Sequence, residues 1–543
     1  MVLLSHFGRS APFRLACVLV GTAAFICGLM DATPGDLAQG NMAAKLSEFS
    51  QLALALARQQ LLAAAAAALL LSLWVYGAAP GEMVAYTITH HRWVLACFLM
   101  PVSFVFDSFW MLRVKLVFLL GSAPEKHDER VGDVQRQVLE WAEDPQGQKM
   151  CTARAGWLAM SLRVGKYKAT HRNIRIELRD VLEVDTDKRT VRVEPMVNMG
   201  QISATLEPLG WTLAVVPELD DLTVGGLING CGVESSSHHY GMFQETIKSC
   251  ELVMADGSLV YCSETEEPDL FRAVPWSHGT LGFLVAAELA IVPAKSWVKL
   301  EYHPCYTKAD ALEQFQTASA DTTGDFVEGL VYSADDAVIM VGTLADESEV
   351  DPAQINRIGR WFKPWWYTHV RAYLSGDSVD YRTGTYVEYI PLRDWYHRHT
   401  KSIFWELEDI IPFGNQVVFR WLFGWAVPPK IALIKLTQTE EIRQLYEKYH
   451  VVQDMLVPMG KLGDALSTMD DEFEVCAYTR SLPRVSMSGR FSDWLLAPID
   501  PLWLCPMKVV DRGPNFLRPS FSRGSPDSSG QVRTLTPKCI ARS

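Results

Sequence analysis

The sequence lacks an excess of positive charge. Its 543 residues contain 50 lysines and arginines against 63 aspartates and glutamates, which gives a net charge of −13. No long run of Lys or Arg interrupts this balance. A protein that binds nucleic acid needs a basic surface to neutralise the phosphates. The composition therefore excludes nucleic acid as the main partner.

Paired cysteines are missing as well. The 11 cysteines are an odd number, are scattered singly, and include no CxxC pair and no zinc-ligand spacing. In a chain of this length, such usage favours a reducing compartment and buried free thiols over a disulfide framework. It also predicts no metal site. The hydrophobic fraction of 49% and the aromatic fraction of 10% exclude a chain that is disordered throughout.

The familiar nucleotide-binding motifs are incomplete. The GCG at 230–232 continues as VES, so GxGxxG is not formed, and GxxxxGK[ST] does not occur. A Rossmann domain is therefore not predicted. Yet Thr223–Gly241, TVGGLINGCGVESSSHHYG, holds five glycines. Such a segment lets backbone amides converge on an anion such as a phosphate, and a flexible surface loop is the alternative.

Long apolar runs crowd the first 120 residues. Residues 61–79 and 93–112 are each long enough to span a bilayer as a helix. They predict an N-terminal membrane anchor of one or two spans within residues 1–122, with buried soluble helices as the alternative. Arg113 and Lys115 follow the second run and favour a cytosolic body. The first 41 residues look additional, because Met42 would make a natural start.

The body of the chain has the pattern of an α+β fold. Asn173–Val197 alternates apolar and charged residues around the turn DTDK, which predicts a hairpin. Met199–Trp211 predicts a short helix that ends near Gly210. Ser249–Ser263 predicts a second pair of strands, and Gly279–Ala294 runs from small residues into a long apolar strand.

Three regions follow from these elements. Residues 123–294 form the predicted first domain, with the glycine-rich segment in its middle. Residues 295–475 are richer in aromatics and alternating charge and form a second α+β domain. The chain at 476–543 ends in a tail rich in Ser, Pro, Gly and Arg without apolar periodicity, which predicts disorder.

The order of these elements resembles the flavin-binding domain of the vanillyl-alcohol oxidase and p-cresol methylhydroxylase superfamily. Three stretches narrow the resemblance to the delta(24)-sterol reductase family, over roughly His91–Asp471: MCTARAGWLAMSLRVGKYKATHRNI, VVPELDDLTVGGLINGCGVESSSHHYG and WYHRHTKSIFWELEDIIPFGN. The resemblance implies a two-subdomain FAD-binding fold at 123–294 and a substrate domain at 295–475. It also makes residues 476–500 an insertion before PLWLCP.

The resemblance further implies where FAD binds. Its pyrophosphate would lie against the glycine-rich segment, and a later G-x-L-G segment would approach the flavin. The R-x-G-G-H loop that carries a covalent flavin elsewhere in the superfamily reads RAGW at 154–157, so FAD is expected to be non-covalent. An exposed arginine near a turn is the alternative for Arg154. The predicted cofactor-binding residues are Thr223, Val224, Gly225, Gly226, Leu227, Ile228, Asn229, Gly230, Cys231, Gly232, Val233, Glu234, Ser235, Arg154, Gly279 and Gly282.

Reduction of an alkene needs a proton as well as a hydride, so an acid is expected near the substrate. The richest cluster of candidates is YHRHT at 396–400, from which Tyr396 and His399 are predicted to be catalytic. In a helix these two share a face, and a glutamate such as Glu406 would raise the pKa of His399. A polar helix surface is the alternative. Three histidines beside the flavin segments are equally open: His238, His239 and His278.

The family implies an enzyme of the endoplasmic reticulum membrane that faces the cytosol. With NADPH as donor it saturates the C24–C25 side-chain double bond of sterols. The implied partners are the sterol, the bilayer and other enzymes of sterol biosynthesis. Two alternatives stay open: a flavin-binding but inactive isoform, suggested by the altered 476–543 region, and another flavin oxidase or dehydrogenase of the same fold. A sugar-lactone oxidase is disfavoured because its His-Trp-x-Lys motif is absent.

Overall fold

The computed structural model divides the chain into two compact units, Met1–Gly121 and Ser122–Ser543. It describes residues 122–143, 147–158, 166–375, 386–427 without 403, 406, 409, 410 and 412, 451–473 without 455, 502–508 and 534–541, with four single positions between 105 and 112. The predicted spans at 61–79 and, apart from those four positions, 93–112 lie outside the described residues. Within these described ranges, no helix has the length and hydropathy that crossing a bilayer requires.

The first sheet is built around one long central strand, β8. Its order is β3-β4-β8-β6-β7, with β5 also paired to β8, and all its pairs are antiparallel. The strands are β3 (Val181–Asp185), β4 (Thr190–Val193), β5 (Trp211–Leu213), β6 (Ile247–Val253), β7 (Leu259–Ser263) and β8 (Phe283–Pro293). Both predicted hairpins and the predicted apolar strand are thereby confirmed. A separate parallel pair joins β1 (Met150–Thr152) to β2 (Arg172–Ile174).

Local sequence signals explain the helices of this region. The helix α7 (His127–Glu143) buries Val131, Val134 and Val138, one face at helical spacing, against the first sheet. The helix α8 (Met199–Leu206) begins at a capping box formed by Asn198 and Gln201. It continues through a 3-10 turn to Gly210, which adopts φ = 76° as its terminating residue. The predicted helix end near Gly210 is confirmed.

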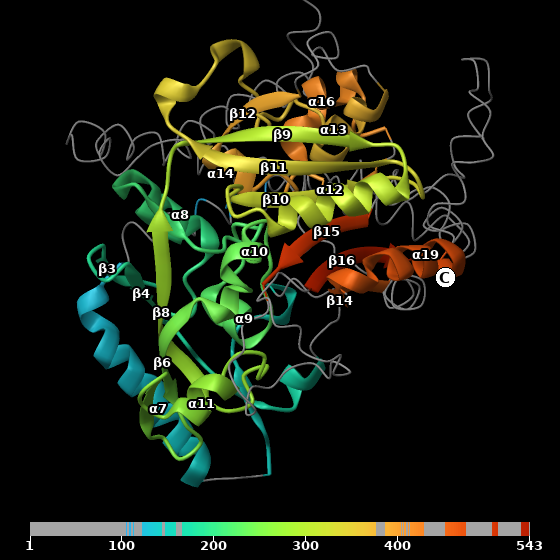
Figure 1. Cartoon of the computed structure of the whole chain (residues 1–543). Helices are drawn as coiled ribbons and strands as arrows, with labels where there is room; N and C mark the ends of the chain where they lie inside the picture. Colours follow the sequence, from blue (N-terminus) through green and yellow to red (C-terminus); the bar gives the residue numbers. More distant parts are fainter. Residues whose placement is uncertain are drawn as a thin grey trace, which may run out of the picture. The chain divides into compact units, whose positions relative to one another are not determined.

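The second sheet is larger, and its order is β12-β9-β11-β10-β15-β16-β13, with β14 paired to β16. Its strands are β9 (Trp297–Cys305), β10 (Phe326–Val331), β11 (Ala337–Ala345), β12 (Val387–Pro391), β13 (Val451–Asp454), β14 (Val457–Pro458), β15 (Leu502–Met507) and β16 (Thr534–Ala541). The remaining helices are α9 (Val224–Asn229), α10 (Ser237–Tyr240), α11 (Pro268–Ala273), α12 (Lys308–Ala320), α13 (Trp366–Ser375), α14 (Leu392–Tyr396), α16 (Val417–Phe423) and α19 (Leu462–Phe473). Figure 1 shows this sheet above the first. The described residues thus form both helices and strands, as predicted.

The C-terminal region departs from the prediction of a disordered tail. β15 pairs with β10, and β16 pairs with β15, β13 and β14. Within the stretch predicted to be disordered, the structure thus describes Thr534–Ala541 as a paired strand. This strand carries alternating Leu535, Pro537, Cys539 and Ala541, but its charge and proline content hide the pattern from a composition argument. Pairing with β15 supplies the long-range partner that the local sequence does not indicate.

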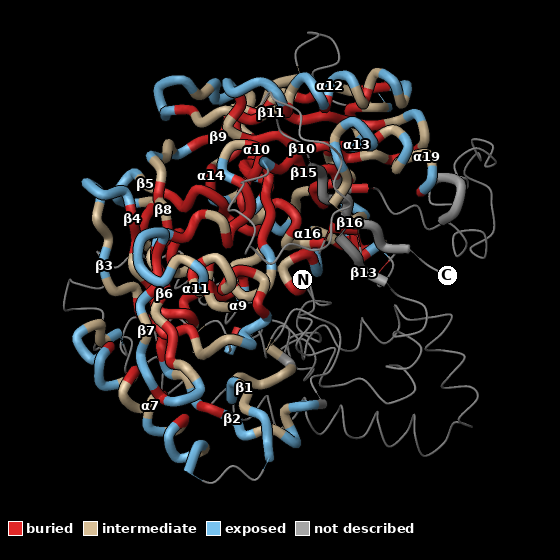
Figure 2. The backbone as a smooth tube through the Cα atoms, turned by 60° about the horizontal axis from the view of Figure 1, so that its bottom comes forward, coloured by how far each residue is buried: buried red, intermediate tan, exposed pale blue. Residues whose placement is uncertain are grey.

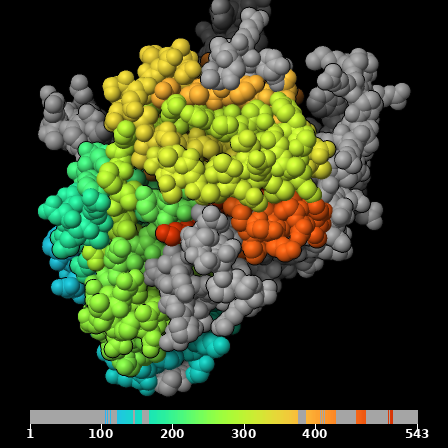
Figure 3. Space-filling model, viewed as in Figure 1, coloured from blue at the N-terminus to red at the C-terminus, as the bar shows by residue number. Residues whose placement is uncertain are grey.

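The two faces of β10 pack against different parts of the protein. A Cβ at Gly329 would lie 3.3 Å from Phe315 of α12 and 3.2 Å from Leu504 of β15, so this face belongs to the core beneath α12 and α19. Figure 3 shows α19, in orange-red, directly below the yellow-green of α12. Since side chains alternate along a strand, Glu328 points to the opposite face. Figure 2 shows buried backbone along β8, β9, β10 and β11.

Candidate functional site between the glycine-rich segment and the second sheet

The two predicted flavin segments lie together in the structure. The amide of His278 donates to the carbonyl of Asn229 at 2.9 Å, and the amide of Trp276 donates to that of Ile228 at 3.2 Å. Ser277 Oγ donates to Asn229 Oδ1 at 3.0 Å. The turn uses positive φ at His278 (53°) and Gly279 (70°), which explains why a glycine follows the histidine.

Most of the glycines serve the packing of the protein itself. A Cβ at Gly225 would lie 2.9 Å from Pro195 Cβ, one at Gly230 would lie 2.8 Å from the carbonyl of Gly226, and one at Gly232 would lie 2.9 Å from Phe243 Cβ. At Gly282 the same atom would lie 2.9 Å from the carbonyl of Val253. The segment is thus neither a free loop nor an open cradle, because α9 occupies its first half.

Several amides of the segment also have partners within the protein. Val224 donates to the carbonyl of Val197 and Gly225 donates to that of Pro195. Gly232 donates to Gln244 Oε1 at 3.2 Å. The predicted convergence of many amides on one phosphate is therefore reduced, and side chains must supply more of the anion binding.

Arg154 fits the anionic group of a flavin nucleotide. Its Nη1 donates to Thr223 Oγ1 at 3.0 Å, directly before α9. Its Nε is buried without a hydrogen-bond partner, and Arg154 forms no ion pair within the described ranges. Burial lowers the pKa of Arg154, with Asp221 opposing the shift. A half-buried cation without a bonded counter-ion would be stabilised by a pyrophosphate, so the residues present fit FAD. Arg154 is half-buried rather than exposed.

The other end of the glycine-rich segment is bonded to the second sheet. The amide of Val327 in β10 donates to the carbonyl of Ser235 at 2.9 Å. His238 Nε2 and His239 Nε2 lie 3.0 and 2.6 Å from the carbonyl of Gly324. Burial, with the neighbouring His239, lowers the pKa of His238 to about 4. The two histidines therefore lie within hydrogen-bonding distance of backbone carbonyls.

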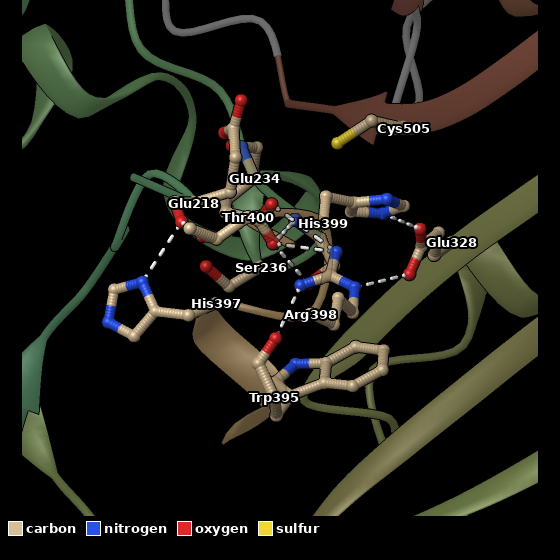
Figure 4. Close-up of polar contacts among 12 residues, drawn as sticks. Glu218, Glu234, Ser236, Glu328, Trp395, His397, Arg398, His399, Thr400 and Cys505 are labelled. Atoms are coloured by element: carbon tan, nitrogen blue, oxygen red, sulfur yellow. Dashed lines mark hydrogen bonds and ion pairs between the residues drawn. The ribbon is translucent and has the colours of Figure 1, made fainter. Parts of the chain in front are cut away.

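A buried ionic network, hereafter the inner cluster, joins this segment to β10. It consists of Glu234, Glu328, Arg398 and His399, whose side chains are at most 2% exposed. Arg398 Nε donates to Glu328 Oε2 at 2.7 Å, and its Nη2 donates to Glu234 Oε2 at 3.0 Å. Figure 4 shows the guanidinium between the two carboxylates and above Trp395, whose ring centroid lies 4.0 Å from Arg398 Cζ.

Sequence reasoning missed Arg398. The available signal was a single arginine between two histidines in an otherwise aromatic stretch. Its guanidinium satisfies two carboxylates and a carbonyl at once, because Nη1 also donates to Trp395 O at 2.8 Å. Only the fold brings Glu234 and Glu328 to the same side chain, from 164 and 70 residues away along the chain.

His399 has a different environment from the one predicted. The helix α14 ends at Tyr396, so Tyr396 and His399 do not share a helical face. Glu406 lies outside the described residues, and the carboxylate bonded to His399 Nε2, at 2.6 Å, is Glu328. Burial lowers the pKa of His399 in spite of Glu328. Against the effect of burial, the charge of Arg398 and the hydrogen bonds from Arg398 and His399 hold the pKa of Glu328 at about 2. We therefore assign an ionised Glu328 beside a neutral His399, and the expected imidazolium is wrong.

Tyr396 points toward the first sheet. Its hydroxyl lies 3.0 Å from Thr212 Oγ1 of β5, and the side chain is buried. Burial raises the pKa of Tyr396, so the phenol keeps its proton at physiological pH. The two predicted catalytic residues therefore have different surroundings. Tyr396, the last residue of α14, contacts the first sheet, whereas His399, beyond the end of α14, contacts β10.

A second group of charges, hereafter the outer cluster, lies nearer to solvent. It consists of Asp220, Arg393 and His397, with His397 Nε2 at 2.9 Å and Arg393 Nη2 at 3.4 Å from Asp220. His397 Nδ1 and Thr400 Oγ1 both lie 2.9 Å from the carbonyl of Glu218. Burial alone would lower the pKa of His397, but Asp220 outweighs it and the pKa is raised.

A cavity of about 60 Å³ lies under α12 and α19, away from these residues. Leu504, Val331 and Ala311 line it, which places it on the Gly329 face of β10. The inner cluster occupies the opposite face. This cavity is therefore not part of the candidate site.

Comparison with known proteins defines the class of this site. The model of the FAD binding domain matches residues 152–263, which include Arg154 and the whole glycine-rich segment. Residues 152–263 are accordingly an FAD binding domain, and the chain is a flavoprotein.

Relatives define the particular family. A Delta(24)-sterol reductase of Homo sapiens is 53% identical over 435 residues, which are 80% of this chain and 78% of that protein. The protein of the same name from Rattus norvegicus is 52% identical over the same shares. That from Arabidopsis thaliana is 40% identical over 479 residues, 83% of this chain and 79% of the plant protein. The chain belongs to the Delta(24)-sterol reductase family and is an FAD-dependent oxidoreductase.

Proposed function

We propose that this chain reduces the C24–C25 side-chain double bond of sterol intermediates such as desmosterol, with NADPH as the electron donor. The observation that supports the proposal is the sequence similarity to Delta(24)-sterol reductases of animals and a plant. It is 53% identity to the human protein over 80% of this chain and 40% identity to the plant protein over 83%. This span includes Arg154, the glycine-rich segment and the inner cluster. The inactive-isoform and other-oxidase alternatives have no comparable support.

This chain's residues divide the work between holding FAD and holding the substrate domain. Arg154 and Thr223 would bind the pyrophosphate, and Gly279 would allow the second segment to approach the ring system. When bound non-covalently there, FAD supplies the hydride chemistry. The inner cluster fixes β10 against the glycine-rich segment, so that the substrate domain keeps one position relative to the flavin domain.

The proton for the second alkene carbon has its better source in Tyr396. The Tyr396 hydroxyl has no carboxylate partner among the described residues, whereas His399 is bonded to Glu328, although burial raises the pKa of Tyr396 and so makes its phenol a weaker acid. Tyr396→Phe removes that proton and leaves the ring packing against Phe326. It should lower kcat about 10²-fold or more with little change in KM, if general-acid catalysis is lost. An unchanged kcat would exclude Tyr396.

We also propose that the enzyme works at the endoplasmic reticulum membrane, with its main unit in the cytosol and in association with other sterol-synthesising enzymes. Sterols partition into lipid, and the apolar runs at 61–79 and 93–112 would keep the chain beside them. Protease protection of tagged full-length chain in microsomes distinguishes this orientation from a lumenal one.

The first experiment is desmosterol reduction by the detergent-solubilised full-length chain with NADPH, together with its flavin absorbance. Product formation with bound flavin supports the proposal. Arg154→Met should lose flavin and activity together, whereas Arg136→Met, at an exposed position of α7, should change neither. Flavin without sterol turnover would overturn the sterol assignment, and turnover in Arg154→Met equal to wild type would overturn the assigned FAD contact.

A further inference from the structure

The surface around α16 is unusually apolar for a surface helix. Val418 is 70% exposed, Leu422 58% and Trp421 56%. Val417 and Phe423 of the same helix and Trp361 of a neighbouring loop are also large, apolar and exposed. Exposed apolar residues gathered in this way mark an interaction surface rather than ordinary scatter. These six residues are called the α16 surface below.

Two segments of the chain build this surface as one unit. The rings of Phe362 and Trp421 stack with centroids 4.7 Å apart. A Cβ at Gly424 would lie 2.6 Å from the carbonyl of Trp361, so the two backbones are in direct contact. Asn415 Oδ1 accepts from the amide of Trp365 and from Arg420 Nη1, each at 3.0 Å. The apolar side chains are therefore held outward by a fixed scaffold.

The two segments that build the surface carry only basic charged residues. The segments 357–366 (RIGRWFKPWW) and 414–427 (GNQVVFRWLFGWAV) contain four basic residues, Arg357, Arg360, Lys363 and Arg420, and no acidic residue. The chain as a whole has a net charge of −13. Asp394 contacts the first segment, where it accepts from the amide of Gly359 at 3.0 Å. A positive apolar surface on an acidic protein is complementary to an anionic partner.

The environment of Arg420 is the strongest indication of an anionic partner. It is the basic residue of α16 itself, and its buried Nε has no hydrogen-bond partner among the described residues. No carboxylate in the described part of the chain forms an ion pair with it, and burial lowers the pKa of Arg420. A headgroup phosphate above α16 would give the guanidinium of Arg420 an anionic partner. Tryptophan together with Arg and Lys around aliphatic residues is the composition of segments that lie in a membrane interface.

We propose that the α16 surface rests on a lipid bilayer with anionic headgroups, its apolar side chains among the upper acyl chains and Arg420 at the phosphates. This contact is separate from the N-terminal apolar runs. The role of this contact rests on the proposed function. A second contact with the membrane would hold the substrate domain at the surface from which a sterol leaves the bilayer.

The test measures depth at single positions of the full-length chain in vesicles. An environment-sensitive fluorescent amino acid replaces Val418 in one protein and Leu259 of β7 in the other. Leu259 is a matched control, because it is also aliphatic and 45% exposed but belongs to the first sheet. Figure 1 places α16 beside α13 and β12, while β6, the partner of β7, lies in the lower sheet.

Spin-labelled lipids in phosphatidylcholine vesicles should quench the probe at position 418 by roughly half or more and leave that at 259 unquenched, as expected for a side chain in the interface. Adding phosphatidylserine should increase the quenching at 418, and Arg420→Gln should remove that increase. Val417→Asp with Leu422→Asp should abolish quenching while the flavin stays bound.

Three outcomes would overturn the proposal: no quenching at 418, equal quenching at both positions, or a probe at 418 that is shielded from water by a cross-linkable second copy of the chain. None of these readouts uses sterol. A chain that quenches normally but does not reduce desmosterol would therefore contradict the proposed function and leave the bilayer contact standing.

Discussion

The inner and outer clusters connect the same segment, 393–400, to the flavin side of the molecule, yet they differ in their access to water. Arg398 is fully buried with its two carboxylates, whereas the side chains of Arg393 and Asp220 are 46% and 43% exposed. In the inner cluster every charge has lost its hydration, so each depends on its partners. In the outer cluster water can replace a lost partner. Burial, rather than the number of ion pairs, therefore sets how much unfolding free energy is lost when one of these residues is replaced.

The largest effect is expected from Arg398→Met. It leaves Glu234 and Glu328 buried without their shared cation, and breaking a buried pair costs about 3–5 kcal/mol of unfolding free energy. Urea unfolding of the purified chain measures the loss. The matched control is Arg393→Met, five residues earlier, which should change stability by less than about 0.5 kcal/mol. Equal losses for the two variants would contradict the distinction between the clusters.

Glu328→Gln sharpens the comparison through pH. The folded-state pKa of Glu328 is about 2, below its ordinary value of 4.5. Its contribution to stability is therefore fully present above pH 4.5 and lost as pH falls toward 2. Wild-type unfolding free energy should decline across this window, and the variant should decline less steeply. The variant should also be less stable at pH 7 by about 2–3 kcal/mol, because a charged hydrogen-bond partner is removed. Parallel curves for the two proteins would exclude Glu328 as the titrating group.

His397→Gln addresses the outer cluster with the opposite sign. Asp220 raises the folded-state pKa of His397 above 6.5 in spite of burial. The stabilisation is fully present below pH 6.5 and is lost as pH rises through the folded-state value. We expect a loss of about 1 kcal/mol or less, because Asp220 is partly solvated. Thermal unfolding between pH 5 and pH 9 measures it, and a wild-type curve that rises with pH in this range would reject the assignment.

Asp220→Asn should have the smallest effect, about 0–1 kcal/mol. It retains the shape of the side chain and removes only its charge. The pH dependence attributed to His397 should disappear in this variant, although overall stability barely changes. A decrease in unfolding free energy as large as that of Arg398→Met would show that water has as little access to the outer cluster as to the inner one.

Local sequence was sufficient for much of the fold. Alternation around a turn specified β3 and β4, a capping residue and Gly210 specified the limits of α8, and Gly257 at φ = 82° closed the β6–β7 turn. Each of these features depends on residues within one element. β16 was missed, since a strand with two charged or proline positions gains its stability from a partner far away in the chain.

The candidate site was predicted only in part for the same reason. The glycine-rich segment was identified from its composition and Gly279 from the family resemblance, and the structure brings them together. The purpose of individual glycines was not visible, because Pro195 and Phe243, which require their small size, come from other elements. The YHRHT stretch was recognised as chemically important, but the helix end at Tyr396 and the carboxylate from β10 changed the assigned charge of His399.

The sequence by itself determined that this protein carries a flavin-binding domain without a Rossmann motif, where its glycine-rich segment lies, and to which family of reductases it belongs. Only the tertiary structure decided that Arg398 is the buried cation, that His399 is neutral, and that Val418 and Trp421 face outward. The physical reason is that charge state and exposure depend on which distant groups exclude water from a side chain. That exclusion is a property of the packed fold and not of any local pattern.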